Sequence, residues 1–322
     1  MSGLPLVTGA TGFAGSHLVD LLLEQADAPA ATEPVITAWG NPNGAPITAR
    51  HPAVAWQAVD VLDRSSVRDA IVALQPSVIY HCAGAADVGT SFTNPLTPLR
   101  VNALGTHHVL DAVRVAGLTT PVVVTGSATV YRASMDALDE DASIGPSSPY
   151  GVSKLAQEML AFAVKTFPVL VARPFNHAGP RQGSAYVTSS FARQIAEIEA
   201  GLKSPVLSVG NLDARRDITD VRDTVRAYAL LAAKGRPSRP YNVCSGRAYR
   251  IGDLLELLLG RARVRVAVAS DPARMRPSDN PVLLGDPQRA RRELGWQASI
   301  AIEDTLSDLL DYWRQHVAAA RA

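Results

Sequence analysis

The stretch LPLVTGATGFAGSHLVDLL, residues 4–22, decides the fold of this chain. Its apolar start predicts a short buried strand, and Phe13 to Gln25 predicts an amphipathic helix. Between them, Gly9, Gly12 and Gly15 form a G-x-x-G-x-x-G turn. Glycine lets the backbone turn tightly and approach a pyrophosphate closely, and the helix N-terminus offers free N–H groups to the phosphates. The stretch therefore predicts the phosphate-binding turn of a dinucleotide site.

Outward from this turn, short apolar runs alternate with helical patterns through the first half of the chain. The runs are nearly continuous, which is typical of strands covered on both faces. Strands alternating with helices predict an α/β fold, a Rossmann-like doubly wound parallel sheet. The expected strands lie within residues 4–9, 34–39, 54–60, 76–84, 121–127 and 167–175, and the expected helices near 13–25, 65–74, 96–116 and 150–166.

After Pro174 proline and glycine become frequent and the polar loops lengthen. We therefore expect a smaller C-terminal substrate lobe over the carboxyl ends of the strands. The predicted division assigns residues 1–175 to dinucleotide binding, with a returning segment at about 217–245 that contains the strand-like run PYNVCSG. Residues 176–216 and 246–322 then form the second lobe.

Composition narrows the possible partners. The chain has 322 residues, of which 47% are hydrophobic, and a net charge of +1, so no strong field favours nucleic acid or a membrane surface. No apolar run approaches the ~20 residues that span a bilayer. Cys82 and Cys244 lie far apart in apolar surroundings, which predicts buried thiols and a cytoplasmic location. The adjacent His107 and His108 point apart on a helix, so no metal site is expected.

Tyr150 and Lys154 stand four residues apart in SSPYGVSKLAQEML, residues 147–160. On a helix both side chains project from one face. A neighbouring ammonium favours the phenolate and is expected to lower the tyrosine pKa from about 10 toward neutrality. The alternative is an ordinary pair on a helix face. Ser127 precedes the pair in VVVTGSATVY, where it follows a predicted strand.

The glycine turn, Ser127 and the Tyr150–Lys154 pair, in this order, resemble the extended short-chain dehydrogenase/reductases that modify sugar nucleotides. The resemblance implies that Ser127, Tyr150 and Lys154 are catalytic. Tyr150 would protonate the oxygen of a ketone, Ser127 would orient that oxygen, and Lys154 would hold the cofactor ribose.

The same resemblance implies a cofactor site. Either Asp60 or Asp63 would meet the adenine amino group, and Asp63 could instead be a helix cap. The small residues Ala83 and Gly84 would let the ribose lie against the backbone. The implied cofactor-binding residues are Gly9, Thr11, Gly12, Phe13, Gly15, Asn41, Asp60, Val61, Ala83, Gly84, Tyr150 and Lys154.

The choice between NAD and NADP is expected to depend on the end of the second strand. NAD-binding proteins place an acidic residue there to hold the ribose 2′-hydroxyl. Here the tip reads ITAWGNPNG, residues 36–44, without an acid. A missing carboxylate removes repulsion against a 2′-phosphate, and Asn41 or Arg50 could meet it. The sequence therefore favours NADP(H) and leaves NAD(H) as the alternative.

The residues after Ser127 distinguish between reactions. The 4,6-dehydratases that this chain resembles carry a glutamate just after the serine or threonine, and it removes a proton beside the ketone. Here these positions are Ala128 and Thr129, which cannot ionise. General acid–base help is worth ~100- to 10,000-fold, so its loss argues against dehydration.

Three segments of the second half resemble the GDP-mannose 4,6-dehydratase group, and most of all its reductase branch: ARPFNHAGPRQG (172–183), VGNLDARRDITDVRD (209–223) and RMRPSDNPVLLGD (274–286). A nucleoside diphosphate carries two negative phosphates that suit arginines. Arg181 and Arg215 are interpreted as surface charges. The implied substrate-binding residues are Ser127, Asn176, Arg193, Arg216, Arg276 and Asp279.

The resemblance implies NAD(P)H-dependent reduction of the 4-keto group of GDP-4-keto-6-deoxy-D-mannose to GDP-D-rhamnose or to its 4-epimer, GDP-6-deoxy-talose. A nucleotide-sugar 4-epimerase with tightly bound NAD is the alternative, because SATVY also suits that class. A non-catalytic cofactor sensor is disfavoured, since Tyr150 and Lys154 are both present. The resemblance also implies a homodimer that pairs through helices 96–116 and 150–166.

Overall fold

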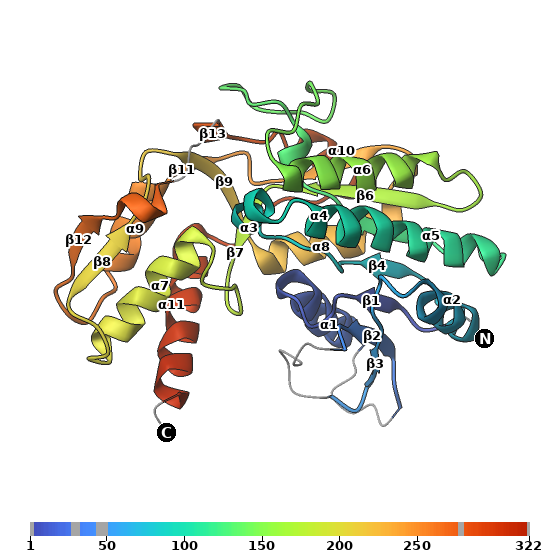
Figure 1. Cartoon of the computed structure of the whole chain (residues 1–322), viewed down its shortest axis with the longest axis horizontal. Coiled ribbons are helices and arrows are strands. Elements are labelled where there is room, and N and C mark those ends of the chain that lie inside the picture. Colours follow the sequence, from blue (N-terminus) through green and yellow to red (C-terminus); the bar gives the residue numbers. More distant parts are fainter. Residues whose placement is uncertain (1–2, 27–32, 43–50, 276–279, 321–322) are drawn as a thin grey trace.

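A computed structural model describes residues 3–26, 33–42, 51–275 and 280–320. Its larger part is a seven-stranded parallel sheet in the order β10-β6-β5-β4-β1-β2-β3 (Figure 1). Each of the apolar runs expected to form a strand contributes one, because a central strand buried on both faces needs apolar residues on both. The strands are β1 (Leu6–Thr8), β2 (Ile36–Gly40), β3 (Val54–Ala58), β4 (Ile79–His81), β5 (Val122–Thr125), β6 (Val169–Pro174) and β10 (Pro240–Val243).

Helices cover both faces of this sheet. On one face α1 (Phe13–Gln25) packs against α8 (Val221–Lys234). On the other, α5 (Gly105–Val115) packs against both α2 (Arg64–Leu74) and α6 (Pro149–Ala163). Two separate apolar clusters lie beneath these layers. The predicted fold class, a Rossmann-like doubly wound sheet, is confirmed.

The helical run expected over residues 96–116 has an irregular centre. It begins as α4 (Leu96–Pro98), widens into a π-helical segment (Leu99–Leu104) and continues as α5. A π-helical turn is rare and often lies at a functional site. This one contains Asn102, whose side chain is fully buried toward α6.

The smaller lobe contains a four-stranded sheet in which β9 (Arg215–Asp220) pairs with β7 (Asn176–Ala178), β11 (Ala248–Arg250) and β13 (Val282–Leu283). A two-stranded sheet joins β8 (Val206–Val209) to β12 (Ala267–Ser270). Three helices, α7 (Val187–Glu199), α9 (Ile251–Leu259) and α11 (Ile302–Ala319), pack together over a third apolar cluster.

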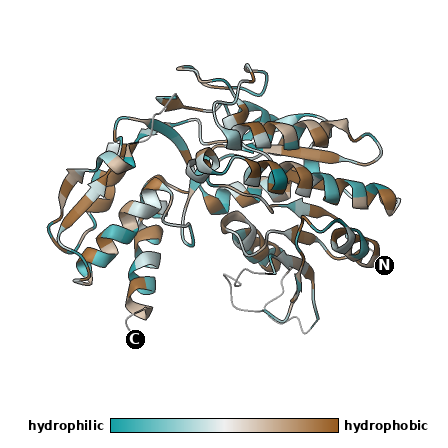
Figure 2. Ribbon diagram, in the orientation of Figure 1, coloured by the Kyte–Doolittle hydropathy of each residue, from teal (hydrophilic) through white to brown (hydrophobic). Residues whose placement is uncertain are grey.

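The lobes share their chain. After β9 the backbone enters α8, which packs on α1, and then β10, which extends the large sheet beside β6. Brown apolar residues line the strands of the large sheet, and teal residues are interspersed on its helices (Figure 2). In the described part of the chain, no helix combines the length and the apolar character needed to cross a membrane.

Candidate active site

The glycine turn lies between β1 and α1 and leaves no room for side chains. Gly9 has φ +64°, and a Cβ on it would lie 2.6 Å from the Cα of Ala83. A Cβ on Gly15 would lie 2.2 Å from the carbonyl oxygen of Gly9. Gly12 caps α1 without a side-chain hydrogen bond to the first N–H groups. A helix N-terminus of this kind fits a pyrophosphate.

Three more of the residues expected to bind the cofactor are Thr11 in the turn, Asn41 after β2 and Phe13 at the start of α1. The methyl group of Thr11 lies beside Gly40 at the end of β2, and Asn41 follows there on the surface. The Phe13 ring stacks on His177 of the smaller lobe, with centroids 5.5 Å apart. Phe13 therefore joins the phosphate turn to the second lobe.

The structure separates the two acids after β3. Asp63 caps α2, accepting hydrogen bonds from the backbone N–H groups of Ser65 and Ser66, and its bonds to these two serines lower its pKa to about 2. Asp60 is exposed and accepts a hydrogen bond from the backbone of Leu62. Asp63 is thus the helix cap that the sequence allowed as an alternative, and Asp60 lies two residues after the end of β3.

Tyr150, Lys154 and Ser127 come together. Ser148 caps α6 by accepting from the backbone N–H of Gly151 at 3.0 Å, and a proline opens the helix. Tyr150 and Lys154 therefore lie one turn apart, with the ammonium 6.0 Å from the phenol ring centroid. Ser127 follows β5 and hydrogen-bonds the phenol of Tyr150.

The expected lowering of the Tyr150 pKa is wrong for this structure. Burial raises the pKa of the phenol above its usual value, and only the hydrogen bond from Ser127 acts to lower it. Burial also lowers the pKa of Lys154 to about 8. Two of the ammonium's donors are engaged elsewhere than at the phenol, since it donates to the Thr125 carbonyl at 2.8 Å and to Gln157 Oε1 at 2.9 Å. Tyr150 therefore keeps its proton near neutral pH.

The position after Ser127 that would carry a dehydratase acid is occupied differently. Ala128 is buried. Thr129 donates to Ser127 Oγ twice, from its hydroxyl at 2.9 Å and from its backbone N–H at 3.2 Å. A hydroxyl has two lone pairs and one proton. Both lone pairs are filled here, so Ser127 offers its proton to the phenol or to a bound oxygen.

Several buried polar residues adjoin this centre and did not stand out in the sequence, among them His81, Asn102, Thr106 and Gln157. Asn102 accepts from the backbone of Ala85 at 2.8 Å and donates to Ser153 at 2.8 Å, beside the pair. The sequence did contain a signal for two of them. His81 is a polar residue within an apolar strand, and Gln157 is a polar residue on the inner face of a helix.

Three of the expected substrate residues, Asn176, Arg193 and Arg216, lie on elements of the smaller lobe. Asn176 is exposed at the start of β7. Arg216 on β9 donates to the carbonyl oxygens of Arg215 and Pro281, and burial lowers its pKa. Arg193 pairs with Glu197 at 2.7 Å and lies over the ring of Trp313. Arg276 and Asp279 lie outside the described residues.

Arg181 is not the surface charge that the sequence suggested. Its side chain is 15% exposed and forms an ion pair with Asp20. It also contacts both ring nitrogens of His17, whose Nε2 lies 2.8 Å from the carbonyl of Pro180. Arg181 thus joins the loop after β7 to α1.

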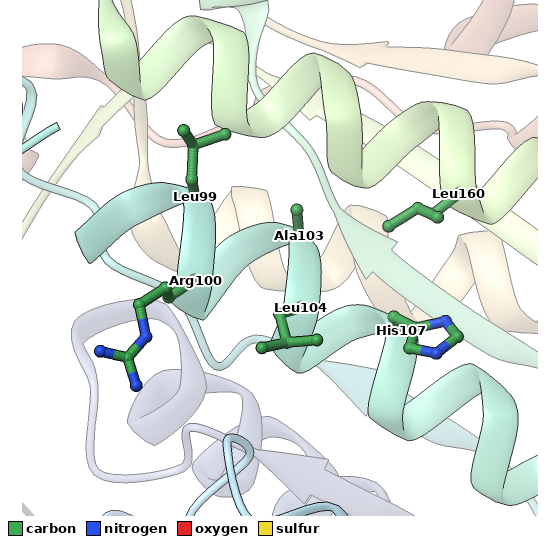
Figure 3. Close-up of a pocket in the computed structure, with 6 residues that line it drawn as sticks. All are labelled: Leu99, Arg100, Ala103, Leu104, His107 and Leu160. Atoms are coloured by element: carbon green, nitrogen blue, oxygen red, sulfur yellow. The ribbon is translucent and has the colours of Figure 1, made fainter. Parts of the chain in front are cut away.

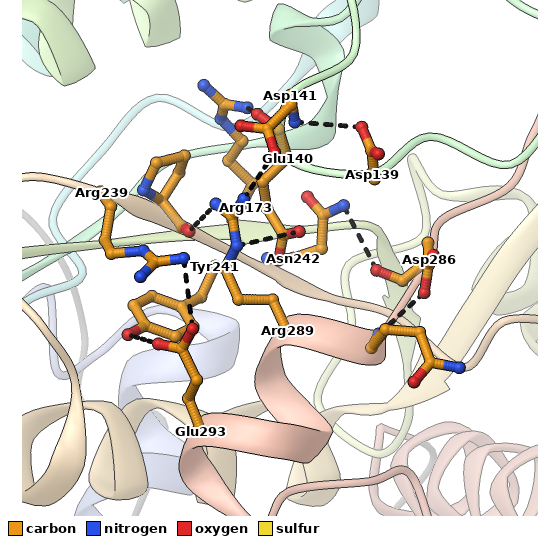
Figure 4. Close-up of polar contacts among 12 residues, drawn as sticks. Asp139, Glu140, Asp141, Arg173, Arg239, Tyr241, Asn242, Asp286, Arg289 and Glu293 are labelled. Atoms are coloured by element: carbon orange, nitrogen blue, oxygen red, sulfur yellow. Dashed lines mark hydrogen bonds and ion pairs between the residues drawn. The ribbon is translucent and has the colours of Figure 1, made fainter.

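A second network of buried hydrogen bonds involves the segment that follows Ser127. Arg173 on β6 donates to Glu158 on α6 and to the phenol oxygen of Tyr131. Arg173 also donates to the carbonyl oxygen of Glu140 at 3.1 Å, and Figure 4 shows these two residues close to Asn242 and Arg289. Asn242 accepts from Tyr131 at 2.7 Å. The loop after Ser127, α6 and β10 are thereby held together.

Residues 6–309 match the sequence profile described as GDP-mannose 4,6 dehydratase. The chain belongs to the GDP-mannose 4,6-dehydratase family. Within this family, it is 36% identical to GDP-6-deoxy-D-mannose reductase of Pseudomonas aeruginosa over 97% of each chain. The predicted family, and with it the class of nucleotide-sugar dehydratases and reductases, is confirmed.

Two solved structures extend the comparison. RMD from Pseudomonas aeruginosa complexed with NADPH has a TM-score of 0.80 and 33% identity, covering 98% of this chain and 100% of that chain. MoeE5 in complex with UDP-glucose and NAD has a TM-score of 0.84 and 28% identity, with the same coverage. This family member therefore shares its whole fold with structures of dinucleotide complexes.

Proposed function

We propose that this enzyme uses NAD(P)H to reduce the 4-keto group of GDP-4-keto-6-deoxy-D-mannose, giving GDP-D-rhamnose or its 4-epimer, GDP-6-deoxy-talose. One observation carries the proposal. A protonated phenol and a serine directed to donate lie together, and the position beside them holds Ala128 and Thr129 in place of an acid. The 36% identity to GDP-6-deoxy-D-mannose reductase supports the substrate.

Ser127, Tyr150 and Lys154 each have a separate role in the proposed reduction. When bound, the reduced nicotinamide supplies a hydride to the carbonyl carbon. Ser127 donates a hydrogen bond to the carbonyl oxygen and orients it. Tyr150, whose pKa is raised by burial, gives its phenolic proton to the same oxygen as negative charge develops there. The Lys154 ammonium would stabilise the phenolate that remains and would hold the cofactor ribose.

We propose NADP(H) as the favoured cofactor, with NAD(H) as the alternative. The end of β2 carries Gly40 and the amide Asn41 where an acidic residue would repel a 2′-phosphate. The structure of RMD complexed with NADPH supports this choice, and MoeE5 with NAD supports the alternative. The Gly9 turn, the loop Ala83–Gly84 and Asp60 would surround the cofactor.

We propose that the smaller lobe, residues 176–216 and 246–322, binds the GDP-sugar, and that residues 1–175 with the segment near 217–245 bind the dinucleotide. Arg216, desolvated and held by carbonyl oxygens, suits the diphosphate. Asn176 would meet the sugar or a phosphate, and Arg193 the base. Arg276 would meet the diphosphate and Asp279 would accept hydrogen bonds from the ribose hydroxyls, as the resemblance implies.

The test is direct. Purified enzyme with NADPH and GDP-4-keto-6-deoxy-D-mannose should oxidise one NADPH per sugar, and NMR of the product should show a 6-deoxy sugar with a new C4 hydroxyl. The orientation of that hydroxyl identifies rhamnose or 6-deoxy-talose. Failure to oxidise either NADPH or NADH would remove the proposal.

A 4-epimerase is the second candidate, since MoeE5 was solved with UDP-glucose and NAD. An epimerase returns its hydride to the substrate, so the purified protein would carry bound NAD and need no added cofactor. Mass spectrometry of the small molecules released when the protein is denatured separates the two functions. Release of NAD, together with interconversion of 4-epimers without added cofactor, supports the epimerase.

We propose that the enzyme is a homodimer in the reducing cytoplasm. Large apolar side chains are exposed along α3 (Val88–Thr93), α4 and α6, among them Phe92, Leu96 and Met159. Between the π-helical segment and α6 lies a hollow lined by Leu99, Arg100, Ala103, Leu104, His107 and Leu160 (Figure 3). The unpaired thiols of Cys82 and Cys244 support the location.

Sedimentation equilibrium tests the dimer. The wild type should sediment as two copies, and Met159→Glu, which puts a charge on α6, should sediment as one. A monomeric wild type at micromolar concentration would contradict the proposal.

A further inference from the structure

The direction of the Lys154 ammonium is fixed by two acceptors. Its Nζ donates to the Thr125 carbonyl at 2.8 Å and to Gln157 Oε1 at 2.9 Å. An ammonium has three donors, so these two described partners leave a third N–H to be directed elsewhere. A Cβ on Gly84 would lie 3.5 Å from this nitrogen, so the ammonium borders the loop proposed to lie under the ribose.

The orientation of Gln157 is itself dictated by its neighbours. The Thr106 hydroxyl lies 2.6 Å from the carbonyl oxygen of Asn102, which can only accept, so Thr106 donates there. Its lone pairs must then accept from Gln157 Nε2 at 2.8 Å and from His81 Nε2 at 2.9 Å. The amide of Gln157 cannot turn round, and its oxygen is left facing Lys154.

The same logic continues to the phosphate turn. Since His81 donates from Nε2 and burial lowers its pKa to about 3, the ring is neutral and Nδ1 accepts from the Thr8 hydroxyl at 2.8 Å. Thr8 in turn accepts from the backbone of Ala83 at 3.2 Å. One ordered chain of hydrogen bonds thus runs from β1, just before Gly9, to α6.

Within the described part of the chain, the titratable groups that act on this ammonium include no carboxylate. They are Tyr150 on α6 and His81 and Cys82 at the end of β4, while Tyr228 on α8 acts on Cys82 and Tyr150. Burial raises the pKa of the Cys82 thiol to about 12, so it is neutral. Gln157 therefore orients Lys154 with a dipole alone.

We propose that Gln157 is a positioning residue: held by Thr106 and His81, it aims the third N–H of Lys154 at the dinucleotide ribose without supplying a countercharge. The inference rests on the proposed reductase function for its kinetic readout, but not for its binding readout. Its consequence is that Lys154 stays a cation only up to mildly alkaline pH.

The first test replaces the neutral amide of Gln157 with a charged carboxylate. Burial lowers the pKa of Lys154 to about 8, so wild-type kcat/KM should fall as pH rises through 8, where the cation is lost. Gln157→Glu places a carboxylate on the ammonium and should move this fall upward by about one pH unit or more. The control, Gln194→Glu, changes another buried helix glutamine, bonded to Ser208 in the smaller lobe, and should leave the profile in place.

The second test needs no turnover. Gln157→Leu and Thr106→Val should each weaken NADPH binding about tenfold by calorimetry, the equivalent of roughly one hydrogen bond, while Thr106→Ser keeps the hydroxyl and wild-type affinity. If folded Thr106→Val and Gln157→Leu bind NADPH like the wild type, the inference fails. If these variants behave as expected but the keto sugar is not reduced, only the proposed function fails.

Discussion

Thr129 determines what Ser127 can do. By filling both lone pairs of the serine oxygen, it turns an alcohol that could accept or donate into a donor toward the ketone oxygen. A donor strengthens as charge develops on that oxygen, so the bond favours the transition state over the ground state.

Thr129→Val is therefore expected to lower kcat about tenfold, the loss of roughly one oriented hydrogen bond, with a smaller change in KM. Thr129→Ser keeps the hydroxyl and should restore most of the rate. Steady-state kinetics on the keto sugar measure both. A valine variant with wild-type kcat would show that the serine needs no such help.

The sequence located Tyr150 and Lys154 because helical periodicity places residues four apart on one face. It gave the wrong direction for the Tyr150 pKa. That direction depends on burial and on where the ammonium points, and Thr125 and Gln157 decide the latter. Gln157 alone lies near the pair in sequence, and the residue that orients it, Thr106, is 51 positions away.

At the scale of elements, the position of α6 is fixed by a buried ion pair. Arg173 and Glu158 have side chains only 5% and 4% exposed, and join β6 to the helix one turn beyond Lys154. The same guanidinium reaches Tyr131, in the loop that follows Ser127. The Arg173 side chain therefore holds α6, which carries Tyr150 and Lys154, and the segment after Ser127 in fixed positions relative to each other.

Glu158→Gln leaves this cation buried without its countercharge and should lower the free energy of unfolding by about 3–5 kcal/mol. The exposed pair of Arg68 and Asp69 provides the control, because Arg68→Gln should cost less than about 1 kcal/mol. Urea denaturation measures both variants. Equal stabilities would mean that the buried pair does not hold α6.

The elements themselves were largely predictable. Continuous apolar runs gave the seven strands of the large sheet, and glycine spacing gave the first turn. The π-helical turn at Leu99–Leu104 was not predictable, because the burial of Asn102 against Ser153 that accompanies it is a tertiary contact between α6 and this segment.

The whole molecule depends on contacts between its two lobes. Phe13 stacks on His177, and His17 reaches the carbonyl of Pro180, 163 positions away. The return of the chain to the large sheet could be anticipated from PYNVCSG, but contacts at this separation could not. The sequence alone therefore predicts a surface charge for Arg181, because its partners His17 and Asp20 lie more than 160 positions away.

Burial lowers the pKa of His17 to about 4 from 6.5. As pH falls, His17 therefore takes up its proton in the unfolded chain before it does so in the folded protein. The stability that neutral His17 provides is present above pH 6.5 and is lost as pH falls toward 4. Between pH 7 and 5 the wild type should lose about 2 kcal/mol more than His17→Gln does. Chemical denaturation at the two pH values measures this difference, and parallel losses would contradict it. His81 titrates in the same window in both proteins, so the comparison isolates His17.

The most direct measurement compares the wild type with Tyr150→Phe on GDP-4-keto-6-deoxy-D-mannose and NADPH, with calorimetric NADPH binding in parallel. Removing the proton donor should lower kcat by about 100- to 10,000-fold and leave NADPH affinity within about threefold. A phenylalanine variant that reduces the ketone at the wild-type rate would contradict the role given to Tyr150, and with it the mechanism.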